Sequence, residues 1–327
     1  MKLITWNIQW CLGVDGRVDP ERIVSHARSM GDFDVLCLQE VARNYPGLKA
    51  NDRTDQFAEL ASLLPGYTPI EAIAVDDFSS EHGRREFGNM ILTRLPVIAA
   101  FRHLLPWPAD PHVPSMQRVA LEAVLKTSKG PLRVTTTHLE FYSERQREAQ
   151  VARLRELQAE ATGHAKDTWQ EQKKGGPFEM RERGPSGVLC GDFNYGIDEP
   201  IHGRLQAPID DPYIADIPRY VDAWTLAHPG TPHDPTVGIF DKEQWQNREF
   251  CCDVICVTED IAARVVDMRV ISKPPLPITS PCCWSCPTRK AVQSLPWLPA
   301  IELQLFPSVL VLAVPQTVVI WRHPEHP

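Results

Sequence analysis

The sequence lacks an excess of positive charge. Its 34 Lys and Arg stand against 42 Asp and Glu, so the formal net charge is -8 at pH 7 and the sequence pI is near 5.8. Proteins dedicated to nucleic-acid binding usually show a basic footprint in such totals. An acidic net charge does not exclude nucleic-acid binding, but the basic surface for it would have to be a local cleft.

Long apolar runs are also scarce. The most apolar segment, Leu305–Trp321, is interrupted by Pro307 and Pro315 and is shorter than the roughly 20 residues that span a bilayer. The first residues, Lys2–Trp6, are typical of a strand and not of a signal peptide. We therefore expect a cytoplasmic monomer that has no membrane segment and no obligate protein partner.

The cysteines show no disulfide framework. Nine are present, and the first six lie in apolar runs such as Val35-Leu36-Cys37-Leu38, where a free thiol packs as a small hydrophobic side chain. Reduced thiols are typical of the cytoplasm. The last three, Cys282, Cys283 and Cys286, form a separate cluster, which lacks the four ligands of a structural zinc site.

What the sequence does have is an alternation of short apolar runs and amphipathic stretches. At 43% hydrophobic and 23% charged residues it has ample material for a core. Strands that alternate with helices predict a layered α/β fold. The expected strands are 3–10, 35–41, 90–93, 119–125, 132–138, 188–193 and 253–257, and the expected helices are 19–30, 55–64 and 143–162. A polar loop is expected between Gly163 and Gly187.

Polar residues interrupt or end several of these apolar strands. A buried Asn, Asp or Glu is unfavourable unless it is paired or binds a metal ion. One such residue is often a satisfied core group, but five in one chain indicate a polar site at one sheet edge. The five places are Trp6-Asn7-Ile8, Leu38-Gln39-Glu40-Val41, Gly88-Asn89-Met90, Thr137-His138-Leu139 and Gly191-Asp192-Phe193-Asn194.

These motifs resemble those of the endonuclease/exonuclease/phosphatase superfamily. WNIQW, LQEV, GNMILTR, THLE, GDFN and CDVICV occur in that family's order and rough spacing, over about residues 1–270. No single motif is decisive, whereas LQEV and GDFN together are specific. The resemblance implies a four-layer α/β sandwich of the DNase I type, with two packed mixed sheets flanked by helices.

The resemblance also implies a metal site. Glu40 would be the principal Mg²⁺ ligand, helped by Asn7, with Mn²⁺ as a substitute. A hard cation that keeps several waters needs only one or two protein oxygens and the substrate phosphate. Gln9 stands where some members have an acidic residue, which removes one carboxylate and weakens the case for a nuclease.

The catalytic roles follow from the same resemblance. Asp192 would orient or deprotonate the attacking water, and Asn194 would hold it together with a phosphate oxygen. His138 and Asn89 would donate to the scissile phosphate. Asp253 would orient a histidine near the C-terminus.

Four other residues near these motifs are open to two interpretations. Arg84 and Arg85 precede the GNMILTR motif and are either phosphate contacts or part of a solvated loop. Tyr142 and Arg145 follow THLE and either line the cleft or lie on the surface at the start of a helix.

The family's last motif, Ser-Asp-His, is missing after Asp253. His323 and His326 lie in a Pro-rich tail without a preceding Asp. The codons for Pro277–Pro287, read from their third base, are compatible with Asp-His-Gln-Pro-Val-Leu-Leu-Glu-Leu-Pro, which resembles the expected ending. The Cys codons force the Leu-Leu pair, whereas Asp and His are one choice among several. We therefore expect residues 271–327 to be an out-of-frame tail and the last strand to be missing.

The resulting hypothesis is a Mg²⁺-dependent phosphoester hydrolase, of phosphodiesterase or nuclease type, that uses in-line attack of water. Loss of the terminal Asp-His pair would impair it. The alternative is a catalytically inactive pseudoenzyme or decayed gene product that keeps the fold. The substrate stays open between nucleic acid and a small phosphorylated molecule, and the acidic balance leans toward the latter.

Overall fold

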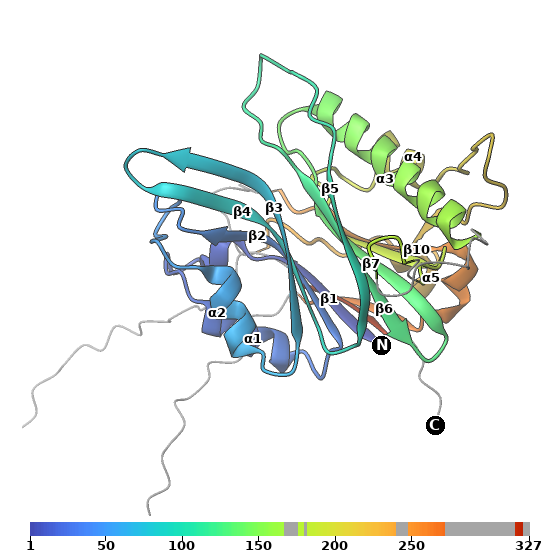
Figure 1. Ribbon diagram of the computed structural model, residues 1–327, viewed down its shortest axis with the longest axis horizontal. Helices are drawn as coiled ribbons and strands as arrows, with labels where there is room; N and C mark the ends of the chain where they lie inside the picture. Colours follow the sequence, from blue (N-terminus) through green and yellow to red (C-terminus); the bar gives the residue numbers. More distant parts are fainter. Residues whose placement is uncertain (167–175, 180–181, 240–247, 272–317, 323–327) are drawn as a thin grey trace, which may run out of the picture.

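Two six-stranded sheets pack face to face, with helices on their outer faces, in the computed structural model of the chain (Figure 1). The structure describes residues 1–166, 176–179, 182–239 and 248–271, and the backbone of 318–322. The expected two-sheet α/β sandwich is confirmed. Part of the expected loop between Gly163 and Gly187, residues 167–175 and 180–181, lies outside these residues, and so do Cys282, Cys283, Cys286, His323 and His326.

The first sheet has the order β11-β12-β1-β2-β4-β3. Its strand pair β1 and β2 is parallel, and the helix α1 connects the two, as the sequence pattern predicts. The elements of this half are β1 (Lys2–Asn7), η1 (Gln9–Cys11), α1 (Pro20–Ser29), β2 (Val35–Arg43), α2 (Gln56–Leu63), β3 (Thr68–Ser79), β4 (Gly83–Thr93), β11 (Asp267–Ile271) and β12 (Val318–Arg322).

The second sheet has the order β5-β6-β7-β8-β10-β9. Here β7 and β8 are parallel, and the long helix α3 connects them. The elements of this half are β5 (Val97–Leu104), β6 (Val119–Thr127), β7 (Gly130–His138), α3 (Glu144–Ala165), β8 (Gly187–Asp192), α4 (Pro200–Gln206), β9 (Tyr220–Asp222), α5 (Ala223–Ala227), β10 (Asp253–Thr258) and η2 (Glu259–Arg264).

Apolar side chains fill the space between the sheets. Leu3 and Cys37 of the first sheet and Leu121, Val134 and Cys190 of the second belong to one buried cluster. Two further clusters lie under the outer helices, one below α1 and α2 and one below α3 and α4. The six cysteines of the described residues are free and buried, as the apolar runs around them predict.

Side-chain caps begin the three longest helices where the sequence predicts them. Asp19 accepts a hydrogen bond from the Arg22 amide, Asp55 from the Ala58 amide, and Ser143 from the Gln146 amide. Each cap satisfies an amide that has no partner inside the helix. The caps fix where α1, α2 and α3 start and so fix the outer layers of the sandwich.

The two parallel strand pairs bring four strand ends to one place. Asn7 ends β1, and Glu40 lies near the end of β2; His138 and Asp192 end β7 and β8. The Asn7 side chain hydrogen-bonds Asp192 directly, so the ends from both sheets meet. The edge site predicted from the polar residues is thus formed by the topology.

Some expected elements are wrong in detail. The first strand ends at Asn7 and not at Trp10, because residues 9–11 turn back in a left-handed conformation. Strands β3 and β5 were not expected, because their half-exposed side chains give no continuous apolar run. The last strand, expected to be missing, is present as backbone: β12 pairs antiparallel with both β1 and β11.

No helix in the described part of the chain is long and apolar enough to cross a membrane. The apolar segment Leu305–Trp321 lies outside the described residues except for its last four positions, which belong to β12.

Gly191 is required by the close approach of β7 and β8. Its φ is +137°, and a Cβ there would lie 1.9 Å from the Thr137 carbonyl oxygen. We expect Gly191→Ala to destabilise the protein by about 2 to 4 kcal/mol in urea unfolding. The control is Gly203→Ala within α4, where a Cβ meets nothing within 4 Å; it should be neutral or stabilise by up to about 1 kcal/mol. Equal urea midpoints for Gly191→Ala and the native chain would contradict the packing.

Candidate active site

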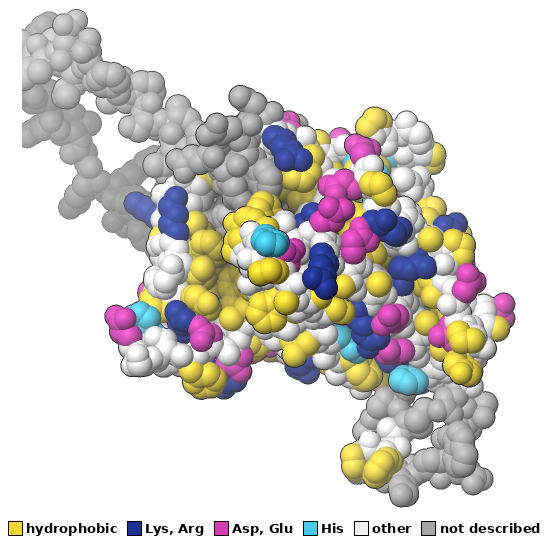
Figure 2. All heavy atoms as spheres, turned by 90° about the horizontal axis from the view of Figure 1, so that it is seen from above, with side chains coloured by type: hydrophobic (Ala, Val, Ile, Leu, Met, Phe, Trp, Pro, Cys, Tyr) yellow, Lys and Arg dark blue, Asp and Glu magenta, His cyan; other side chains and the backbone are white. Residues whose placement is uncertain are grey.

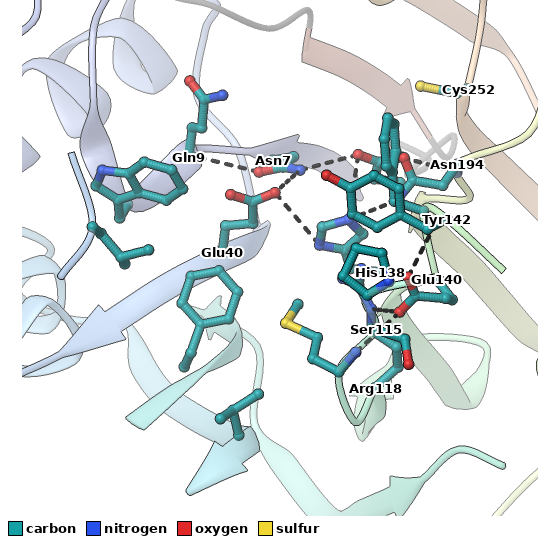
Figure 3. Close-up of a pocket in the computed structure, with 18 of the residues that line it drawn as sticks. Asn7, Gln9, Glu40, Ser115, Arg118, His138, Glu140, Tyr142, Asn194 and Cys252 are labelled. Carbon is teal, nitrogen blue, oxygen red and sulfur yellow. Dashed lines mark hydrogen bonds and ion pairs between the residues drawn. The ribbon is translucent and has the colours of Figure 1, made fainter. Parts of the chain in front are cut away.

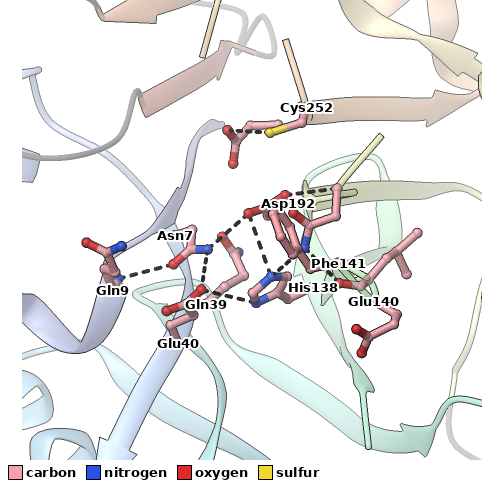
Figure 4. A network of polar contacts seen from close by, with 12 residues as sticks. Asn7, Gln9, Gln39, Glu40, His138, Glu140, Phe141, Asp192 and Cys252 are labelled. Atoms are coloured by element: carbon pink, nitrogen blue, oxygen red, sulfur yellow. Dashed lines mark hydrogen bonds and ion pairs between the residues drawn. The ribbon is translucent and has the colours of Figure 1, made fainter. Parts of the chain in front are cut away.

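Asn7 is the centre of the cluster at the strand ends. Its Nδ2 donates to Glu40 Oε1 at 2.9 Å and to Asp192 Oδ2 at 3.0 Å, while its Oδ1 accepts from the Gln9 amide at 3.1 Å (Figure 4). The side chain is buried, and each of its polar atoms is used. Asn7 therefore holds one carboxylate from each sheet against the other.

A bulge in β2 gives Glu40 its position. The pairing with β4 shifts register between Leu38 and Val41, and Glu40 has a φ of +61°. Bulges of this kind redirect a side chain. Gln39 can therefore point between the sheets, where its Nε2 donates to Thr136 Oγ1 at 2.7 Å, while Glu40 points into the cleft.

A left-handed turn follows Asn7. Gln9, Trp10 and Cys11 all have positive φ, at 48°, 44° and 62°. This conformation costs roughly 1–2 kcal/mol for each residue other than glycine, so it needs support from its surroundings. Trp10 Nε1 donates to the Lys49 carbonyl, and Gln56 Nε2 donates to the Trp10 carbonyl. The turn places Trp10 in the wall of the cleft.

The contacts of Asn194 determine the tautomer of His138. Asn194 Nδ2 lies 2.9 Å from the Leu139 carbonyl, which can only accept, so this atom is the amide nitrogen. The same atom lies 2.8 Å from His138 Nε2, which must accept in turn. Burial, followed by the charge of Arg118, lowers the pKa of His138 well below its usual value. The ring is neutral and carries its proton on Nδ1, which faces Glu40 Oε1 at 3.8 Å.

Burial shifts both carboxylates of the cluster toward their neutral forms. It raises the pKa of Glu40 to about 7; Asp192 adds to this, and the hydrogen bond from Asn7 opposes it. Burial also raises the pKa of Asp192, against hydrogen bonds from Asn7 and from the Asn194 amide. The Asn194 amide donates to Asp192 Oδ1 at 2.9 Å, so both oxygens of this carboxylate are held.

Asp253 lies beside this cluster and is incompletely paired. It is the cross-strand partner of Asp192 between β10 and β8, and it is buried. Burial and the charge of Asp192 raise its pKa well above the usual value. Cys252 Sγ lies 3.9 Å from Oδ2, whereas Oδ1 has no hydrogen-bond partner among the described residues. The family resemblance predicts that Asp253 orients a histidine, and this unpartnered oxygen could accept a hydrogen bond from one.

Three of the residues suggested as phosphate contacts have other partners. Asn89 Nδ2 donates to the Val119 carbonyl between the sheets, and Asn89 is not among the cleft-lining residues, so the structure does not support a phosphate contact. Arg84 and Arg85 pair with Asp76 and Asp77 on the neighbouring strand.

The residues that follow the THLE motif divide into two kinds. Of the two interpretations of Tyr142, the structure supports the one in which this residue lines the cleft. Arg145 instead donates to the Ala109 carbonyl and does not line the cleft.

Arg118 and Glu140 form a buried pair that the sequence did not reveal. Arg118 Nε donates to Glu140 Oε2 at 3.2 Å, and both side chains line the cleft (Figure 3). Arg118 Nη1 is buried without a hydrogen-bond partner among the described residues. Glu140 belongs to the THLE motif and could have been chosen, whereas a single Arg before a strand carries no pattern. An unpartnered guanidinium N–H in a cleft suits an anion.

The cleft has a carboxylate ligand that could hold one hard cation. In the described ranges no group of three or more His, Cys, Asp or Glu side chains could hold a metal ion. Mg²⁺ requires less, because it binds through one or two carboxylates and keeps its waters. Glu40 fits that requirement. Asn7 does not fit as an oxygen ligand in this arrangement, because it turns its amide nitrogen toward Glu40 and its Oδ1 toward the Gln9 amide.

Two facing sheets with a carboxylate, amide and imidazole cluster at their strand ends define a layered α/β protein with a polar site in a cleft. The chain belongs to the Endonuclease/Exonuclease/phosphatase family, whose model matches residues 4–274. Enzymes of this family are hydrolases that act on phosphoester bonds. No curated protein matches the chain by sequence.

Solved structures share the fold at low identity. A protein of this family from Beutenbergia cavernae is 19% identical, with a TM-score of 0.58, over 98% of this chain and 70% of that one. A mannosyl-6-phosphatase from Bacteroides thetaiotaomicron is 14% identical, with a TM-score of 0.60, over 99% and 100%. The human nocturnin catalytic domain, solved with a sulfate anion, is 18% identical, with a TM-score of 0.53, over 99% and 93%.

Glu40→Gln tests the electrostatics of the cluster. The pKa of Glu40 rises from 4.5 to about 7 in the fold, so the stability that its protonated form contributes is full below pH 4.5 and is lost as the pH rises through 7. Without divalent cations, Glu40→Gln should match the native chain at pH 4.5 and exceed its stability by up to about 3 kcal/mol at pH 8.

Urea unfolding at both pH values measures this difference. Excess Mg²⁺ at pH 8 should stabilise the native chain and leave Glu40→Gln unchanged, because only the ionised carboxylate attracts the cation. The exposed Glu81→Gln serves as the control and should follow the native chain throughout. Identical pH dependence in the native chain and Glu40→Gln would show that Glu40 is not held as described.

Proposed function

We propose that the active site of this chain is that of a Mg²⁺-dependent phosphoester hydrolase, of phosphodiesterase or nuclease-like type. The observation that carries the proposal is the convergence of Asn7, Glu40, His138, Asp192 and Asn194 from both sheets within hydrogen-bond or ion-pair reach of one another. Membership of a family of phosphoester hydrolases supports it.

Asp192 is the group that takes a proton from the attacking water. Its burial raises its pKa toward the range where a carboxylate is an effective general base. Asn194 fixes both Asp192, through its amide, and His138, through its side chain. His138 can donate only from Nδ1, because Nε2 accepts from Asn194. Arg118 Nη1 supplies a positive donor for a phosphate oxygen.

Glu40 is the residue that would hold Mg²⁺, or Mn²⁺ in its place. A bound divalent cation would polarise the phosphoryl group and offset its charge. Asn7 positions Glu40 and Asp192 and does not itself act as a ligand in this arrangement. The structure of nocturnin with a bound sulfate agrees with anion binding by a member of this fold.

The missing Asp-His pair limits this activity. Asp253 Oδ1 has no hydrogen-bond partner in the described part of the chain. This supports the loss of a histidine that would donate a hydrogen bond to this oxygen. We infer that residues 271–327 are an out-of-frame tail and that turnover is impaired. The second candidate function, an inactive pseudoenzyme or decayed gene product that keeps the fold, rests on the same orphaned oxygen.

A comparison of two chains tests both candidates. The 327-residue chain with Mg²⁺ should be slower than a frame-restored chain by about 10² to 10⁴, the usual effect of removing a positioned acid or electrostatic donor. The assay should use an abasic duplex, plasmid DNA, a generic phosphodiester and inositol phosphates. EDTA should abolish turnover by the restored chain, and Asp192→Asn should lower it by a similar 10² to 10⁴. Robust turnover by the 327-residue chain would contradict the impairment.

Sequencing the gene tests the tail separately. The shifted frame over codons 277–287 should read Asp-His-Gln-Pro-Val-Leu-Leu-Glu-Leu-Pro, with the shift between codons 268 and 277. A shifted frame that lacks the Asp-His codons would refute the out-of-frame origin and leave the pseudoenzyme as the better description.

A further inference from the structure

The cleft carries little positive charge. Of the described residues that line it, Arg118 is the one Lys or Arg, and Glu140 already pairs with it. Glu40 and Asp192 add two acidic groups. Each phosphate of a polyanion needs its own cationic partner or cation. The described residues of the cleft therefore supply a cationic donor for one phosphate group.

The neighbouring arginines do not extend this anion site. Arg43 pairs with Asp55, Glu71 and Glu86. Arg84 and Arg85 pair with Asp76 and Asp77 along the β3–β4 hairpin. These guanidinium groups are neutralised by carboxylates of the same chain, so these three arginines offer no basic track from the catalytic cluster to a nucleic-acid backbone or a polyphosphorylated ring.

Apolar and aromatic residues make the remaining walls. Figure 2 shows hydrophobic side chains gathered around a hollow on this face. One wall comes from η1, the segment after β2, and strands β3 and β4; the other comes from the segments before β6 and after β7. The first wall consists of Trp10, Tyr45, Leu48, Val75 and Phe87, and the second of Pro114, Met116, Phe141 and Tyr142.

The rings pack against one another in pairs. Tyr45 packs edge-on against Phe87 with ring centroids 6.2 Å apart, and Phe141 against Tyr142 at 4.7 Å. Rings arranged in this way favour a planar aromatic ligand, which offers both a face and an edge. The cavity measures about 400 Å³, which is at the small end of ligand sites.

We propose that the substrate is a phosphoester with a single phosphate group whose alcohol is a small aromatic group, bound between these two walls. The proposal rests on the function proposed above, and it specifies the substrate class of the same site. The phosphate lies at Arg118 and the catalytic cluster, and the ring packs between Trp10, Leu48 and Tyr142. Nucleic acid, inositol phosphates and sugar phosphates are disfavoured.

Binding to the 327-residue chain tests the proposal without requiring turnover. Titration calorimetry with Mg²⁺ compares diphenyl, dibutyl and dimethyl phosphate with inositol hexakisphosphate. We expect diphenyl phosphate to bind at least tenfold more tightly than dimethyl phosphate and at least threefold more tightly than dibutyl phosphate. Inositol hexakisphosphate should bind no more tightly than dimethyl phosphate.

Variants on both walls locate the aromatic group. Tyr142→Ala and Leu48→Ala should each weaken diphenyl phosphate at least fivefold and leave dimethyl phosphate unchanged. Tyr142 and Leu48 are partly exposed, so both variants should fold. Tyr213→Ala, whose ring is 94% exposed outside the cleft, should change neither affinity.

The outcomes separate this proposal from the proposed function. Equal affinity for diphenyl and dibutyl phosphate, tightest binding of the hexakisphosphate, or wall variants without effect would overturn the aromatic substrate class and leave phosphoester hydrolysis standing. Failure of all four probes to bind, together with no turnover by the frame-restored chain, would overturn the proposed function itself.

Discussion

The site depends on the two hydrogen bonds that the side-chain amide of Asn7 donates to carboxylates. The amide joins Glu40 of the first sheet to Asp192 of the second, and two buried carboxylates would otherwise repel each other at the seam between the sheets. Two features of the backbone position the groups that make this contact. A left-handed turn after Asn7 returns the Gln9 amide to its oxygen, and the bulge at Glu40 brings the carboxylate within reach. The fold and the chemistry are therefore coupled through one side chain.

The sequence predicts much of the fold because buried parallel strands have apolar runs that end in polar residues. β1, β2, β7 and β8 all have this pattern, and they position most of the site. Strand β3 does not, since its side chains are half exposed and ion pairs to β4 hold it near the hairpin turn. Hydrophobic periodicity carries no information about such a strand.

A site residue can be predicted from the sequence where its type makes burial unfavourable. It cannot be predicted where only the geometry of the folded chain gives it a role. Asp192 and Glu40 stand out because a carboxylate is unfavourable in an apolar strand. Arg118 does not stand out, because only the folded chain shows that it lines the cleft and that its buried Nη1 has no hydrogen-bond partner among the described residues. For Asn89 the structure does not support the predicted phosphate contact, because its amide donates to the Val119 carbonyl, a partner that no sequence pattern reveals.

The end of such a chain normally meets two requirements together, the closure of a sheet and the supply of catalytic side chains. Strand β12 separates the two. Its backbone lies between β1 and β11, so it covers an edge that would otherwise leave the β1 peptide groups open to another chain. A ladder of main-chain hydrogen bonds does not depend on which side chains the strand carries. Pairing of this kind can therefore be kept while the side chains of a strand change, whereas a catalytic site depends on those side chains.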